Sequence, residues 1–113
     1  MKPSAVSFTL VAALSAAVCI PALPSEAADA DAGRKKARQC QTCHGIDGIA
    51  KIPIAPHIAG ESEIYLVTQL KAFRSGKRTH EIMTVIAKDL SDQDMADLAA
   101  WYASIEIKAT LPE

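Results

Sequence analysis

Two cysteines and a histidine stand together at residues 40–44, where the sequence reads CQTCH. Cys40 and Cys43 are three positions apart, and His44 follows the second cysteine directly. This pattern admits four kinds of chemistry: a disulfide, half of a zinc site, a redox-active dithiol, or covalent attachment of a haem group. The rest of the chain has to decide between them.

The spacing favours haem attachment. Two thiols about one helical turn apart can add to the two vinyl groups on one edge of a porphyrin, and the adjacent histidine then lies under the iron as an axial ligand. A zinc site would need two further Cys or His ligands, and the remaining histidines, His57 and His80, are far apart in the sequence. A thioredoxin-like pair would need a βαβ context that this sequence lacks. A disulfide between Cys40 and Cys43 remains as the alternative.

An iron atom held by His44 has a sixth coordination position. Four side chains are candidates for it: Met83, Met95, His57 and His80. Met95 falls on a regular helical pattern and is expected in the core, whereas both histidines are expected in exposed loops. Met83 lies in an irregular segment from which a thioether can point inward, so it is favoured. Thioether ligation would favour ferrous iron and raise the reduction potential.

The ring of an axial histidine usually donates its second N–H group to a carbonyl oxygen. The loop after the CQTCH motif contains Pro53 and Pro56, and a proline offers only a carbonyl acceptor and a fixed geometry. Pro56 is the predicted acceptor, although either proline could serve only to stiffen the loop.

The first 28 residues are expected to be a cleaved secretory signal peptide. Lys2 supplies a positive charge, residues 7–20 form the apolar run SFTLVAALSAAVCI, and small residues follow. Cleavage is expected after Ala27 or Ala28, with Ala30 as the fallback, so residues 1–28 form the leader and 29–113 a single domain. The apolar run is too short to span a membrane, and the exported chain is expected in the periplasm without a membrane span.

Cleavage would also remove Cys19, leaving Cys40 and Cys43. Export favours disulfides over free thiols, so this pair must be oxidised, metallated or covalently capped. A domain of about 85 residues with few aromatic side chains has a marginal core, and a large apolar cofactor would help to fill it.

The charge pattern bears on partners. The net charge is −1, which gives no argument for a nucleic-acid partner. One basic group could steer an acidic redox partner; its members are Lys71, Arg74, Lys77 and Arg78. An ordinary solvated helix end would look the same.

The sequence predicts an all-α domain with long loops. A short helix is expected over residues 33–39, after an Ala/Asp-rich run at 27–32 that should fray. Residues 45–60 contain three glycines and two prolines and should form a loop. Ser62 is a good N-cap for the next helix, which Gly76 should end.

The C-terminal part continues this pattern. Residues 77–90 should form a loop followed by a short helical turn. Ser91 should cap the last helix, and Leu90 and Met95 stand at the spacing of a hydrophobic staple across that cap. No stretch alternates strongly enough to indicate a strand.

Taken together, these segments resemble class I c-type cytochromes, in particular the small bacterial group that includes cytochrome c4 and c-553. Three stretches between Gly33 and about Ser104 carry the resemblance: GRKKARQCQTCHGIDG, PHIAGESEIYLVTQLKAFRSGKR and IMTVIAKDLSDQDMADLAAWYASI. The resemblance implies the small cytochrome c fold, with three to five helices wrapped around one covalently bound haem. Cytochrome c4 carries two such domains, whereas this sequence contains one.

The resemblance assigns roles to four residues at the haem: thioether links at Cys40 and Cys43, and iron ligation by His44 and Met83. It also implies that the Pro56 carbonyl orients the axial histidine and that Trp101 packs the last helix against the first. The resemblance also implies a contact between Arg78 and a haem propionate, because Arg78 matches the family's arginine after a glycine. A solvated surface charge is the alternative.

The predicted function is that of a periplasmic monohaem electron carrier and not an enzyme. An iron with both axial positions filled has no site for a substrate, so its chemistry is one-electron exchange through an exposed haem edge with donor and acceptor proteins. One alternative is a haem c subunit of a sulfur- or alcohol-oxidising complex. Another is a haem peroxidase or ligand sensor with an open sixth position, which would require Met83 to leave the iron.

Overall fold

The computed structural model describes residues 26–113. Its helices follow one another along the chain as α1 (Ala30–Lys36), the 3₁₀ helix η1 (Ala37–Gln39), α2 (Gln41–His44), α3 (Glu63–Ser75), α4 (Met83–Lys88) and α5 (Asp92–Ala103). Residues 26–113 contain no strand, and long loops at 45–62 and 76–82 join the helices, as the sequence predicts. No helix in this range is long and apolar enough to cross a membrane. The leader prediction rests largely on residues 1–25, which lie outside the described part.

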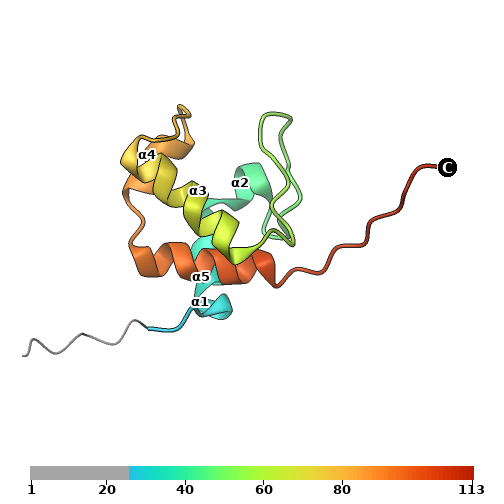
Figure 1. Ribbon diagram of the computed structural model, residues 1–113, viewed down its shortest axis with the longest axis horizontal. Coiled ribbons are helices and arrows are strands. Elements are labelled where there is room, and N and C mark those ends of the chain that lie inside the picture. The colour runs from blue at the N-terminus through green and yellow to red at the C-terminus, as the bar shows by residue number, and fades with distance from the viewer. Residues whose placement is uncertain (1–25) are drawn as a thin grey trace, which may run out of the picture.

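Helices α3 and α5, the two longest, make most of the contacts between helices (Figure 1). Helix α1 packs along α5, and α3 packs against both α5 and α4. Seven buried side chains form the core between them: Ala37, Leu66, Leu90, Met95, Leu98, Ala99 and Tyr102. In the view of Figure 1, α4 and the 45–60 loop lie on opposite sides of α3.

Helix α1 begins earlier than the sequence predicts. The Asp29 carboxylate accepts hydrogen bonds from the backbone N–H groups of Asp31 and Ala32 at 2.8 and 3.1 Å, which caps the helix. The Asp29 N–H in turn donates to the Asp97 carboxylate on α5 at 2.8 Å. The expectation that residues 27–32 fray was therefore wrong for most of this run, because an N-cap and a contact with α5 fix it.

Helices α1 and α5 approach closely at Gly33. A Cβ atom at Gly33 would lie 1.9 Å from the Asp97 carbonyl oxygen and 3.0 Å from the Trp101 Cβ, so only glycine fits here. The Arg34 guanidinium lies 5.5 Å from the centre of the Trp101 ring. Trp101 thus lies at the contact between the last helix and the first, as predicted.

The two longer helices begin and end where their local signals indicate. The Ser62 hydroxyl accepts a hydrogen bond from the Tyr65 N–H, and Gly76 ends α3 in the left-handed conformation with φ of 78°. Ser91 and Asp94 form a reciprocal capping box at the start of α5. Leu90 and Met95, the predicted staple pair, are 4% and 0% exposed, and both belong to the core.

Candidate functional site

The CQTCH motif folds into a single helical turn. The N–H groups of Cys43 and His44 donate to the Cys40 carbonyl at 3.3 and 2.9 Å. Positions three and four residues apart lie on the same face of a helix, so both sulfur atoms and the imidazole project from one side of α2. Cys40 and Cys43 form no disulfide with each other, which leaves both thiols available to one planar group.

The environment of Cys40 argues against a redox-active dithiol. Burial raises the pKa of the Cys40 thiol to about 11, a hydrogen bond with Tyr102 lowers it in part, and the neighbouring Cys43 raises it further. Reactive cysteines need the opposite, a lowered pKa that makes the thiolate at neutral pH. In residues 26–113, no group of three or more His, Cys, Asp or Glu side chains could hold a metal ion, so the zinc alternative also lacks a ligand set there.

His44 is held in the tautomer that a metal ligand needs. Its side chain is 9% exposed, and its Nδ1 atom lies 2.9 Å from the Pro56 carbonyl oxygen. A carbonyl can only accept a hydrogen bond, so Nδ1 carries the proton. In the neutral ring, Nε2 then presents its lone pair, which is the usual arrangement of an axial or metal-bound histidine.

The other two histidines are held in the opposite tautomer. His57 Nδ1 accepts a hydrogen bond from the Ala50 N–H at 2.8 Å. His80 Nδ1 accepts from the N–H groups of Ile82 and Met83 at 3.2 and 3.4 Å. When Nδ1 of a neutral imidazole accepts, Nε2 carries the proton and has no lone pair for iron. The hydrogen bonds therefore disfavour both histidines as the sixth ligand, a distinction that sequence reasoning did not reach.

Helix α5 fixes the polypeptide that follows His44. The Tyr102 hydroxyl donates to the Gly45 carbonyl at 3.1 Å, and the Trp101 Nε1–H donates to the Ile46 carbonyl at 3.0 Å. The sequence gives no indication of this role of Tyr102. Buried tyrosine hydroxyls usually find a partner, but no sequence signal identifies a partner 57 residues away.

Gly48 closes the 45–60 loop on itself. Its φ of 72° is in the left-handed region, and its carbonyl accepts from the N–H groups of Ile58 and Ala59 at 2.8 and 3.1 Å. A Cβ at Gly48 would lie 2.6 Å from the Ala59 backbone nitrogen. This close contact brings Pro56, which precedes Ile58 by two residues, back towards His44.

Met83 is the first residue of α4, and its side chain is half-buried. Met95, the other methionine weighed for the iron, is fully buried in the core next to α3. Met95 thus has the structural role that the sequence predicts for it. The role of Met83 as a ligand stays a prediction.

The predicted basic group divides into two pairs. Lys71 Nζ lies 3.2 Å from the Asp92 carboxylate, and Arg74 forms an ion pair with the same residue of α5. The Arg78 guanidinium donates to the Gln69 side chain and lies 4.6 Å from the centre of the Phe73 ring. Lys77 is exposed next to it. The contact of Arg78 with a propionate stays a prediction.

The residues at α2 fit a covalently attached haem. Two free thiols and an imidazole nitrogen lone pair leave one face of a short helix, and this donor set matches thioether attachment with a histidine ligand. A glycine, Gly45, ends the turn at φ of 75° and lets the chain leave it at once.

Comparison with known proteins agrees with this chemistry. The family model for cytochrome c matches residues 30–106. Cytochrome c4 of Pseudomonas aeruginosa is 43% identical over 95 residues, covering 84% of this chain and 47% of that protein. Cytochrome c-554(548) of Halomonas halodenitrificans is 46% identical over 83 residues, covering 71% of this chain and all of that protein.

A solved structure shows the same fold. The crystal structure of reduced recombinant cytochrome c4 from Pseudomonas stutzeri superposes with a TM-score of 0.66 at 38% identity, over 71% of this chain and 47% of that one. The chain thus spans about half the length of the cytochrome c4 relatives that it matches. These relatives support haem c as the cofactor and an electron carrier rather than an enzyme. The chain belongs to the cytochrome c family, as a class I c-type cytochrome domain of the c4 type.

Proposed function

We propose that this protein is an exported, periplasmic carrier of single electrons. In this proposal Cys40 and Cys43 hold one haem c by thioether bonds, and His44 and Met83 bind its iron on opposite faces. Haem iron supplies a reversible one-electron change between its ferric and ferrous states. The protein supplies two axial ligands and an environment that excludes other ligands, so that electrons pass through the haem edge.

The observation that carries the proposal is the hydrogen bond between His44 Nδ1 and the Pro56 carbonyl at 2.9 Å. Among the three histidines in residues 26–113, this bond alone leaves Nε2 with a lone pair. The carbonyl also fixes the plane of the ring and makes Nε2 more basic. Ile58 and Ala59 hold this part of the loop through Gly48, so the ring orientation is set before any ligand binds.

Met83 is tested by a pair of methionine variants of the holoprotein. Ferric iron bound by a thioether gives a weak far-red absorption band, so Met83→Leu should abolish the band and lower the reduction potential. Met95→Leu is the matched control, because Met95 is fully buried and this swap roughly conserves its volume. The control should keep both the band and the potential.

Two results would count against the assignment. A band that persists in Met83→Leu would remove Met83 from the iron. A haem that is extracted by acid from the wild-type protein would contradict thioether attachment at Cys40 and Cys43. The first result would mean that another thioether binds the iron.

We further propose that an acidic redox partner docks at Lys77 and Arg78. The structure supports this pair over the other half of the basic group, since Lys71 and Arg74 already contact Asp92. Charges that an internal carboxylate neutralises contribute little to the attraction of a distant partner. The Arg78 guanidinium lies over the ring of Phe73, a contact that holds it next to Lys77.

Two double variants compare the pairs. Lys77→Gln with Arg78→Gln should slow reduction by the physiological donor at low salt and flatten the dependence of the rate on ionic strength. Lys71→Gln with Arg74→Gln should change the rate less. Equal effects of the two double variants would contradict docking at Lys77 and Arg78.

A second candidate function is that of the haem subunit in a sulfur-oxidising system. One relative favours it: the thiosulfate dehydrogenase electron acceptor of Thiomonas intermedia is 37% identical over 73 residues, which is 63% of this chain and 33% of that protein. A stable complex with a dehydrogenase on gel filtration would support this candidate over a freely diffusing carrier.

A further inference from the structure

His80 forms an unusual cap on the turn that leads into α4. Its ring Nδ1 accepts hydrogen bonds from the backbone N–H groups of Ile82 and Met83 at 3.2 and 3.4 Å. These groups belong to the first turn of a helix, where backbone N–H groups lack partners within the helix. One ring nitrogen therefore holds the backbone of Met83 itself.

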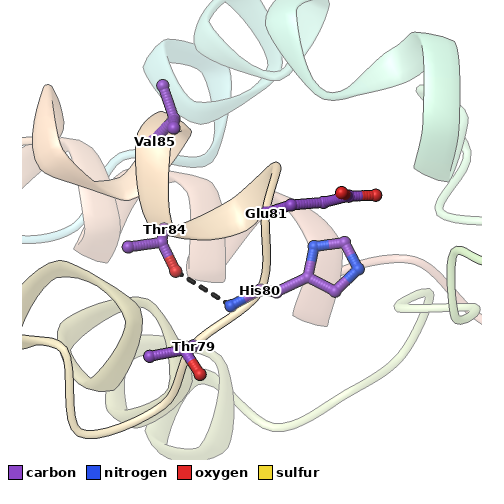
Figure 2. Close-up of a pocket in the computed structure, with 5 residues that line it drawn as sticks. All are labelled: Thr79, His80, Glu81, Thr84 and Val85. Atoms are coloured by element: carbon purple, nitrogen blue, oxygen red, sulfur yellow. Dashed lines mark hydrogen bonds between the residues drawn. The ribbon is translucent and has the colours of Figure 1, made fainter.

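The cap is reciprocal, as Figure 2 shows in part. The His80 N–H donates to the Thr84 hydroxyl at 2.9 Å, and the Thr84 N–H donates to the His80 carbonyl at 3.0 Å. At the start of α5, Ser91 and Asp94 form a related cap, in which each side chain accepts from the backbone N–H of the other residue. At α4 the Thr84 hydroxyl accepts from the backbone N–H of His80 as Asp94 does from Ser91, but the imidazole accepts from Ile82 and Met83 instead of from Thr84.

Helix α4 packs on α3, but few of its side chains are buried. It contains six residues, and Ala87 is its only buried one. Val85 is 60% exposed and Ile82 is 40% exposed. So short a helix is not stable by its own hydrogen bonds, and little burial of apolar surface compensates. The cap is therefore a large part of what orders the backbone at Met83.

We propose that His80 is a positioning residue for the sixth iron ligand, acting through its ring nitrogen on the backbone of Met83. The inference rests on the proposed ligation by Met83. Ordering this backbone in advance removes an entropy cost from the iron–sulfur bond. Without the cap, Met83 would spend more time away from the iron, and a competing ligand would bind more tightly in proportion to that fraction.

The test uses imidazole as the competing ligand on the ferric holoprotein. Binding is followed by the loss of the far-red band. His80→Leu removes the acceptor and should raise the apparent affinity for imidazole about three- to tenfold, the range that corresponds to the loss of an N-cap. His80→Asn supplies a side-chain oxygen that can cap the same turn, and it should return the affinity to within about twofold of the wild type.

A matched control comes from the other loop. His57 also accepts a backbone hydrogen bond at Nδ1, from Ala50, but it lies in the loop that follows His44. His57→Leu should leave the imidazole affinity unchanged. If His80→Leu does not accumulate as folded protein, Thr84→Ala removes the reciprocal acceptor alone and should shift the affinity in the same direction by a smaller factor.

The outcomes separate this inference from the proposed function. A wild-type protein without the far-red band would contradict ligation by Met83. A normal band with no change of affinity in His80→Leu would overturn only the role of His80. Failure of His80→Asn to restore the affinity would overturn the cap as its cause, and so would an equal change in His57→Leu.

Discussion

The two sides of the proposed haem site are held in different ways. The His44 side, residues 40–60, is tied to α5 by hydrogen bonds from Trp101 and Tyr102 that join residues 55 and 57 positions apart. The first turn on the Met83 side, residues 77–88, is held by hydrogen bonds between residues two to four positions apart. Contacts of longer range lie at its two ends: Arg78 donates to the Gln69 side chain before α4, and Arg74 donates to the Leu90 carbonyl at 2.9 Å just after it.

This difference indicates which of the two proposed ligands can dissociate from the iron first. Long-range contacts with the core break only when the whole domain unfolds, whereas a short segment with few buried side chains can open alone. The proposed ligand His44 is therefore held by the fold as a whole. The proposed ligand Met83 is held by one capped turn and by the packing of α4 on α3.

The largest effect should come from Tyr102, which anchors the His44 side. Tyr102→Ala removes a side chain that is 3% exposed together with its hydrogen bond to Gly45. It should lower the free energy of unfolding by about 3–5 kcal/mol. Denaturant unfolding of the holoprotein, followed by circular dichroism, measures this change.

Val85→Ala provides the comparison on the Met83 side. Val85 is 60% exposed, so its truncation should change the free energy of unfolding by less than about 0.5 kcal/mol. If the two variants lose similar stability, the two sides of the site are equally coupled to the core and the contrast between them fails.

The smallest effect that we expect is a loss of stability at acidic pH. Lys36 of α1 contacts the Asp94 carboxylate of α5 at 2.8 Å. Hydrogen bonds from Lys36 and from the Ser91 backbone, in that order, lower the pKa of Asp94 below its ordinary value of 3.8. Because the pKa of Asp94 is lower in the folded state than in the unfolded state, the ion pair stabilises the fold fully at pH values above the unfolded-state pKa. This stabilisation is lost as the pH falls through the lower, folded-state pKa.

Lys36→Gln checks this dependence. Because the pair is exposed to solvent, its loss should lower the free energy of unfolding at neutral pH by no more than about 1 kcal/mol. The difference from the wild type should vanish in acid below the folded-state pKa. A difference that persists there would mean that Lys36 stabilises α1 by packing and not by charge.

The sequence predicted the elements that depend on local signals. Ser62 and Ser91 mark the starts of helices through side chains that cap the nearest turn, and Gly76 marks the end of α3 through its left-handed backbone. Such signals act within four residues. The start of α1 was mispredicted because Asp29 caps it from within a run that looks disordered by composition. Its second contact, with Asp97, crosses 68 residues and has no local signal.

Prediction of the site from the sequence had the same limit, since it reached only contacts that are local in the chain. The spacing of Cys40, Cys43 and His44 favoured covalent haem attachment over the alternatives, because one helical turn contains all three residues. The tautomers of the three histidines were not predictable, since they depend on which backbone group each Nδ1 atom contacts after folding. The role of Tyr102 was missed for the same reason.

The pairing of α1 with α5 has a consequence for how such a domain can be used within longer chains. The first and last helices complete the same core, and the chain leaves the domain beyond both of them, through exposed residues 26–29 and 106–113. A further copy could therefore be joined in series without breaking any helix contact. The cytochrome c4 relatives, of which this chain matches 40–47%, are longer. A unit whose first and last helices pack on each other can be extended at either end without opening its core.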